Sequence, residues 1–165
     1  MANHFDEDIA QELHENPASF LNVSLDSGTA KTWYKVKGVN NFDHVIENLK
    51  KYSQSAHHPE QVSLKYIILP GINDSEEDFR AFVDFKKKWN MSLGTFSRDN
   101  RVLSDLDPSS DASLSHKVFN SNIIESAARL TAIHAKEIGS VSFSNFTEEE
   151  KHQIVNLANE ILKYM

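Results

Sequence analysis

The chain has 165 residues, of which 39% are hydrophobic and 25% charged, so its length and composition predict one compact domain rather than a disordered chain. A formal net charge of −7 and a pI near 5.6 exclude nucleic acid as an expected partner, because such a surface repels a phosphate backbone. The sequence has no signal peptide, no membrane-length apolar run and no cysteine, so we expect a cytoplasmic protein without membrane contact, disulfides or thiolate metal sites.

Helical and strand patterns alternate in the first half of the chain. Apolar residues at helical spacing predict a helix from Asp6 to Glu15 and a second one over residues 42–52. Alternating polarity predicts a strand from Phe20 to Asp26, and a nearly continuous apolar run predicts a buried strand from Val62 to Leu69. Residues 29–37 have room for a helical turn.

The second half repeats this order. Asn73-Asp74-Ser75 offers capping side chains for a helix that reaches Trp89, and Met91 to Ser97 has the pattern of a third strand. A serine- and aspartate-rich stretch from Ser104 to Ser115 is long enough for a lid or binding loop. The remaining patterns are a helix over 123–138 that stops at Gly139, a short strand over 141–144, and a helix that opens with a capping box at Thr147.

The alternation of strands and helices indicates βα units around a parallel sheet, either barrel-like or doubly wound. We expect a single α/β domain over residues 1–165, with core βα units over 1–103 and an irregular segment plus two helices over 104–165. In both architectures the ligand site lies at the carboxyl ends of the strands. Side chains on the strands and directly after them are therefore the functional candidates.

The first strand carries a polar face made of Asn22, Ser24 and Asp26. A parallel strand that is covered on both sides is expected to be apolar on both faces. The pattern therefore indicates either side chains that face a polar cavity or an edge strand with one wet face, and both interpretations stay open.

The second strand carries one charge, Lys65, which shares a face with Ile67 and Leu69. Burying an unpaired ammonium is costly, so we expect a carboxylate or an anionic ligand group near it. Lys65 would then stand beside Asp26 or Ser24. The alternative is a lysine whose ammonium reaches water at a sheet edge.

Other charged or glycine-containing motifs predict no site. Lys86-Lys87-Lys88 lies in a predicted amphipathic helix and is interpreted as a solvated face. The eight histidines have no metal-binding spacing and are interpreted as surface residues. Dinucleotide, P-loop and serine hydrolase motifs are absent from the sequence.

Two segments together resemble a known family. Residues 20–29 (FLNVSLDSGT), with the following 37–48 segment, resemble the fourth strand and helix of radical S-adenosylmethionine (SAM) enzymes. Residues 62–78 (VSLKYIILPGINDSEED) are similar to their fifth strand and its Pro-Gly-x-Asn-Asp turn, in the style of pyruvate formate-lyase activating enzymes. The resemblance covers about residues 3–97 and implies the C-terminal half of a TIM-type (β/α) barrel, with three to four parallel strands and flanking helices.

The resemblance also implies positions for S-adenosylmethionine contacts. Ser24 and Asp26 match a polar pair that contacts the ribose or amino-acid part, and Lys65 matches the basic residue of the fifth strand. Ile67 matches the apolar position that packs near the adenosine. Ser97, or Thr95 in another register, would lie near the adenine.

The cysteine loop that holds the [4Fe-4S] cluster in this family is missing here. A parent enzyme would cleave S-adenosylmethionine reductively to a 5′-deoxyadenosyl radical, but this chain alone is expected to be inactive and to bind neither cofactor tightly. We expect a piece of a longer enzyme whose partner is the missing N-terminal half of the barrel; a natural truncated product is the other explanation.

A different class of function also fits the sequence. The first strand lacks the neighbour that a complete barrel would supply, and an open strand edge invites pairing with another chain. The chain would then be a non-catalytic binding or interaction module that docks or forms a homodimer through that edge.

Overall fold

A computed structural model describes residues 3–91, 94–99 and 112–165, the last range without the side chains of 112–121. No helix within these residues is long and apolar enough to cross a membrane. In chain order the elements are α1 (Glu7–Glu15), β1 (Leu21–Ser24), α2 (Ala30–Lys37), α3 (Phe42–Ser55), the 3₁₀ turn η1 (Pro59–Gln61), β2 (Val62–Ile68), α4 (Glu76–Lys88), β3 (Gly94–Arg98), α6 (Ala112–Glu137), β4 (Ser142–Ser144) and α7 (Glu148–Leu162).

The described strands form one parallel sheet in chain order. β1 pairs with β2, β2 with β3, and β3 with β4. A doubly wound sheet reverses its strand order at a switch point, whereas sequential order is the arrangement of a (β/α) barrel. The prediction of a partial barrel with three to four parallel strands is therefore confirmed.

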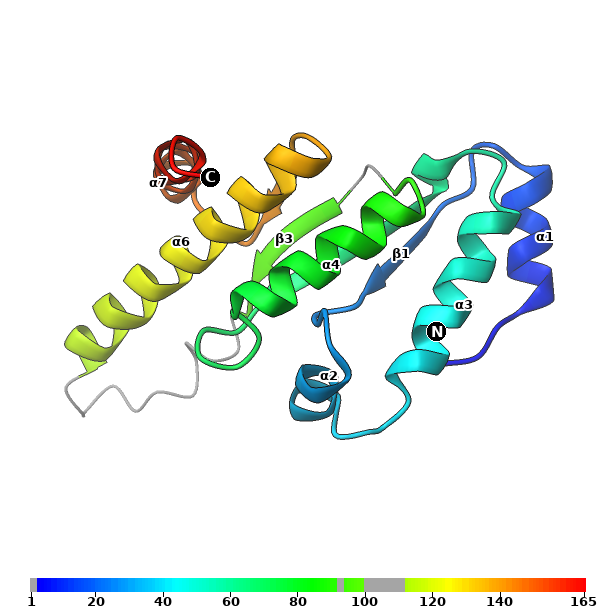
Figure 1. The fold of residues 1–165 in the computed structure, drawn as a ribbon, viewed down its shortest axis with the longest axis horizontal. Coiled ribbons are helices and arrows are strands. Elements are labelled where there is room, and N and C mark those ends of the chain that lie inside the picture. The colour runs from blue at the N-terminus through cyan, green and yellow to red at the C-terminus, as the bar shows by residue number, and fades with distance from the viewer. Residues whose placement is uncertain (1–2, 92–93, 100–111) are drawn as a thin grey trace.

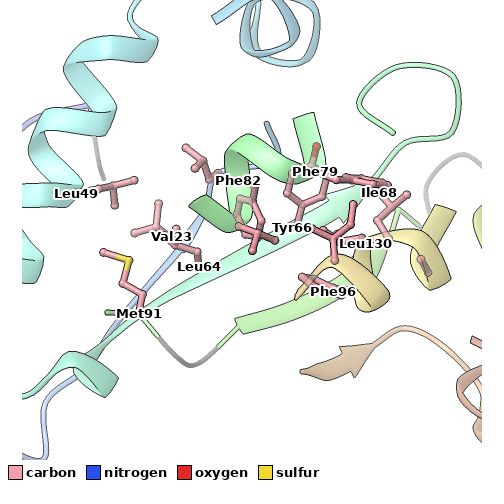
Figure 2. Close-up of a cluster of buried hydrophobic side chains, with 14 of the residues drawn as sticks. Val23, Leu49, Leu64, Tyr66, Ile68, Phe79, Phe82, Met91, Phe96 and Leu130 are labelled. Carbon is pink, nitrogen blue, oxygen red and sulfur yellow. The ribbon is translucent and has the colours of Figure 1, made fainter. Parts of the chain in front are cut away.

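One face of the sheet is apolar and is covered by helices. Figure 1 shows α4 in front of the strands, with α3 and α6 on either side of it. In Figure 2 the Tyr66 ring of β2 lies against Phe82 and Phe79 of α4, with ring centroids 4.8 and 5.7 Å apart. Burying each such side chain contributes about 2 kcal/mol. The apolar strand residues buried on this face are Leu21, Val23, Val62, Leu64, Tyr66, Ile68 and Phe96.

The alternate side chains of the strands point to the other side, which we call the open face. Most of them are exposed or half-buried: Asn22, Ser24, Ser63, Lys65, Ile67, Thr95, Ser142 and Ser144. A sheet with one apolar and one polar face is the arrangement expected when one side packs on the core and the other meets water or a ligand.

A buried carboxylate joins the start of α2 to the start of α4. Asp78 accepts hydrogen bonds from the Gly28 amide and from the hydroxyls of Thr29, Thr32 and Ser75, at 2.6 to 3.2 Å. The chain at Gly28 passes so close to α4 that a Cβ there would lie 2.0 Å from the Asp78 carbonyl oxygen. Position 28 therefore has to be glycine for this junction to form.

Most element predictions agree with the structure, with shifts at the ends. The first strand is shorter than predicted and ends at Ser24, and the third starts at Gly94 rather than Met91. The turn expected over 29–37 is a full helix, α2, capped by Thr29. The irregular segment predicted over 104–115 is helical from Ala112 onward, and its earlier residues lie outside the described ones.

Two surface predictions are wrong. Lys86, interpreted as part of a solvated face, is fully buried between α4 and α6, whereas Lys87 and Lys88 are exposed. His134, interpreted as a surface residue, is also fully buried, and its Nε2 lies 2.8 Å from Lys86 Nζ. Burial is possible because each supplies the other's hydrogen bond, which neither residue's local sequence reveals.

Candidate functional site

A row of polar side chains crosses the open face from one sheet edge to the other. The register aligns Ser24 of β1 with Lys65 of β2, Lys65 with Thr95 of β3, and Thr95 with Ser142 of β4. The hydroxyls of Thr95 and Ser142 are hydrogen-bonded at 2.9 Å. The row therefore presents hydroxyl groups on both sides of a single ammonium.

Lys65 is half-buried at the centre of this row. Among the described residues, no carboxylate forms an ion pair with it. A partly desolvated ammonium without a counter-ion favours an anionic group, and Lys65 has three donors to offer it. The arrangement suits a small ligand that carries one carboxylate or phosphate together with hydroxyl groups.

Asp26 lies at the carboxyl end of β1 but does not join Lys65. Its backbone has a left-handed conformation with φ of 53°, and its side chain is buried. One carboxylate oxygen accepts from the Ile67 amide at 2.8 Å, and the other forms an ion pair with Lys37 at 2.7 Å. Of the two neighbours predicted for Lys65, the structure provides Ser24 and not Asp26.

Ile67 and Ser97 form the next row toward the carboxyl end. They are paired across β2 and β3 on the same face as Lys65 and Thr95. Ile67 is half-buried, while Ser97 is fully buried and accepts a hydrogen bond from Asn145 at 3.2 Å. Both alternatives for the third strand, Thr95 and Ser97, therefore point to the open face.

Asn73 is a site residue that sequence reasoning had placed only in the segment that caps the next helix, whereas the residue that caps α4 is Ser75. Its side-chain amide donates to the carbonyl oxygens of Asp26 and Ile67, and its amide oxygen accepts from the Leu69 amide, all at 2.7 to 2.9 Å. Its own carbonyl accepts from the Tyr66 hydroxyl at 2.6 Å. Asn73 therefore ties the carboxyl ends of β1 and β2 together, and its place in the Pro-Gly-Ile-Asn-Asp turn was the available signal.

The Tyr66 hydroxyl beneath this turn is far from ionisation. Burial raises the pKa of Tyr66, and the carboxylates of Asp78, Asp26 and Asp74 raise it further. Tyr66 therefore acts as a fixed hydrogen-bond donor to Asn73 and not as an acid or base.

A hollow of about 450 Å³ lies beside the edge strand β1. Asn22 and Ser24 line it from the strand, and Trp33, Lys37 and Val39 line it from α2 and the turn after it. The backbone amides of successive residues in a strand point to opposite sides. The Leu25 amide donates to the Lys65 carbonyl oxygen in β2, so the amides of Asn22 and Ser24 point away from β2, toward this hollow. The edge offers both backbone donors and partly apolar walls.

The open face and its surroundings do not form a metal site in the described residues. No three histidine, aspartate or glutamate side chains gather there in a way that could hold an ion. With no cysteine in the sequence, the chain cannot supply thiolates to an iron–sulfur cluster.

Comparisons with known proteins give one partial similarity. No protein-family model matches the chain, and no solved structure matches it. GTP 3′,8-cyclase from Synechocystis sp. is 31% identical over 81 residues, which are 49% of this chain but 23% of the cyclase. The cyclase is a radical SAM enzyme. The similarity thus relates the chain, at a coarse level, to the radical SAM superfamily that its strand and turn motifs resemble.

Proposed function

We propose that the chain forms the S-adenosylmethionine- and substrate-facing wall of a radical SAM enzyme of the activating-enzyme type. In such a parent, the open face would line the barrel interior, and a further segment would pair with β1 and close the ring. The chain spans less than a quarter of the length of the matched cyclase. The reaction of the complete parent enzyme is therefore part of this proposal.

The observation that carries the proposal is the polar row on a sequentially ordered parallel sheet. Ser24, Lys65 and Thr95 come from three adjacent strands and point to one face. S-adenosylmethionine carries a carboxylate and ribose hydroxyls, which match one ammonium flanked by hydroxyls. Ile67, in the next row, offers apolar surface for the adenosine.

The fit differs between the two cofactors of the superfamily. The residues present suit S-adenosylmethionine, whose binding would orient its carboxylate at Lys65. They do not suit the cluster, because no cysteine is present to hold it. The chain alone is therefore proposed to bind weakly and to be catalytically inactive, while another segment contributes the cluster.

Replacing Lys65 with methionine is expected to weaken S-adenosylmethionine binding about 10-fold, the value of one charge-assisted hydrogen bond. Amide chemical shifts recorded during titration with millimolar S-adenosylmethionine would measure it, with the largest shifts expected at Ser24, Lys65 and Ser97. Adenosine lacks the carboxylate, so its binding should change little in the variant.

The matched control is Lys88→Met, because Lys88 is exposed at the end of α4, on the other side of the sheet. Shifts that cluster away from the polar row, or an equal loss of affinity in both variants, would contradict the proposed role of Lys65.

A second candidate function, an interaction module, is favoured by the edge of β1. Phe20 is 76% exposed immediately before this strand, and Val39 in the neighbouring hollow is 46% exposed. Exposed apolar side chains beside free strand amides are typical of a pairing edge. The partner in this second candidate function is another copy of the same chain, so the module would be a homodimer.

Under this second candidate, light scattering should show a dimer that forms as protein concentration rises. Asn22→Pro is expected to keep the chain monomeric without unfolding it, because the amide it removes points away from β2. A wild-type chain that stays monomeric at about millimolar concentration, well above typical weak-dimer affinities, would rule the dimer out.

A further inference from the structure

Lys86 and His134 form a buried pair where α4 and α6 meet over the amino end of β3. Lys86 Nζ lies 2.8 Å from His134 Nε2, and both residues are fully buried. Gly94 leaves the space for the ammonium, since a Cβ there would lie 2.2 Å from Nζ. The Phe82 ring below the ammonium and the Phe96 ring against the imidazole complete the apolar surround.

The hydrogen bonds determine which nitrogen carries the imidazole proton. His134 Nδ1 lies 2.8 Å from the Gly139 carbonyl oxygen, which can only accept, so Nδ1 is the protonated nitrogen. Nε2 then has a free lone pair and accepts from the Lys86 ammonium. A second proton on the imidazole would turn this acceptor into a donor that faces a cation.

Within the described residues, no carboxylate forms an ion pair with Lys86 or His134. Burial is the cause that lowers the pKa of Lys86 to about 8, and burial followed by the Lys86 charge lowers that of His134 to about 4. Two carboxylates lie close to the pair in sequence: Asp84 of α4 is exposed, and Glu137 of α6 binds Lys87 at 2.6 Å. Neither carboxylate contributes to the pKa of Lys86 or His134. The described parts of β2, β3 and β4 place no titratable group against the pair.

We propose that this pair is a proton-dependent latch that holds α6, and with it β4 and α7, against α4 and the sheet. The latch is closed while His134 is neutral and opens when the imidazole is protonated. Because α6 leads directly into β4, opening it also releases Ser142 from the polar row and Ser144 from its place beside Ser97. Acidification would therefore loosen the outer part of the open face while β1 and β2 stay in place.

The sign of the pH effect follows from the direction of the histidine shift. His134 has a lower pKa in the folded chain than its ordinary value of 6.5, so the unfolded chain binds the proton first as pH falls. The stabilisation is complete above pH 6.5 and is lost as pH falls toward about 4. The full loss corresponds to a factor of about 300 in the folding equilibrium constant.

The test compares urea unfolding of the wild-type chain and of His134→Gln at pH 7 and pH 4.5. Glutamine can accept from Lys86 but does not titrate, so the wild-type folding constant should fall about 60-fold more than that of the variant over this interval. His152→Gln, at an exposed position of α7, is the control and should follow the wild type. Equal pH dependence of wild type and His134→Gln would overturn the latch.

A second measurement uses the wild-type chain alone, so it does not depend on a variant that folds. Nitrogen NMR of the imidazoles should find His134 neutral with the proton on Nδ1 at pH 5.5. Below pH 5, amide protection factors, which compare exchange with the intrinsic rate at the same pH, should fall in α6 and α7 before α1 and α3. An imidazole of His134 that is protonated at pH 5.5, or an equal fall of protection in all four helices, would overturn the proposal.

Discussion

Replacing Asp78 with alanine is expected to lower the free energy of unfolding by about 4 kcal/mol, because four donors lose their common acceptor in a buried position. The Gly28 amide has no room to move toward another partner, since its chain segment already touches the α4 backbone. The hydroxyls of Thr29 and Thr32 can rotate, but the surrounding residues are largely buried. Urea unfolding at pH 7 measures the loss.

Two further variants separate the carboxylate's role from a general effect on α4. Asp78→Asn keeps one acceptor oxygen and is expected to lose about half as much stability as the alanine variant. Asp84→Ala, at an exposed position of the same helix, should change stability by about 0.5 kcal/mol or less. A loss at Asp84 as large as that at Asp78 would mean that the buried junction is not the cause.

Asn73→Ala is expected to cost about 3 kcal/mol, because the Asp26 and Ile67 carbonyls and the Leu69 amide would lose this partner in buried or half-buried positions. The effect should also be local: amide exchange should increase at Ile67 and Leu69 before it increases in α7. Urea unfolding and hydrogen exchange together measure the two effects.

Asn73→Asp tests whether donation by the amide is the important property. The aspartate has the same shape and keeps the acceptor, but it places a carboxylate against two carbonyl oxygens, so we expect it to be as destabilising as alanine. Asn159→Ala, at an exposed position of α7, should have little effect. An Asn73→Asp variant with wild-type stability would show that these two hydrogen bonds contribute nothing.

Local patterns predicted the elements because they depend on a few neighbouring residues. The last helix is the plainest case: Thr147 and Glu150 form both hydrogen bonds of the predicted capping box. Element ends were less predictable. The pairing of β3 extends over Gly94–Arg98 in register with β2, whereas propensity alone placed that strand three residues earlier.

The sequence predicted most of the residues that belong to the candidate site, but it did not predict which of them contact one another. Period-2 alternation put Ser24 and Lys65 on strand faces, and the register of β1 and β2 then made them neighbours. The same alternation grouped Asp26 with Ser24, but the chain turns into a left-handed conformation at Asp26, and its carboxylate binds Lys37 and the Ile67 amide instead. A change of backbone direction after a strand leaves no periodic signal.

The sequence by itself determined the order of βα units, the polar face of the strands and the absence of thiolate ligands, since each is a property of residue type and short-range spacing. Only the tertiary structure decided that Asp78, Asn73 and the Lys86–His134 pair are buried and satisfied. The physical reason is that a polar group is stable inside a protein only with a partner, and each of these groups has at least one partner 46 to 50 positions away in the chain.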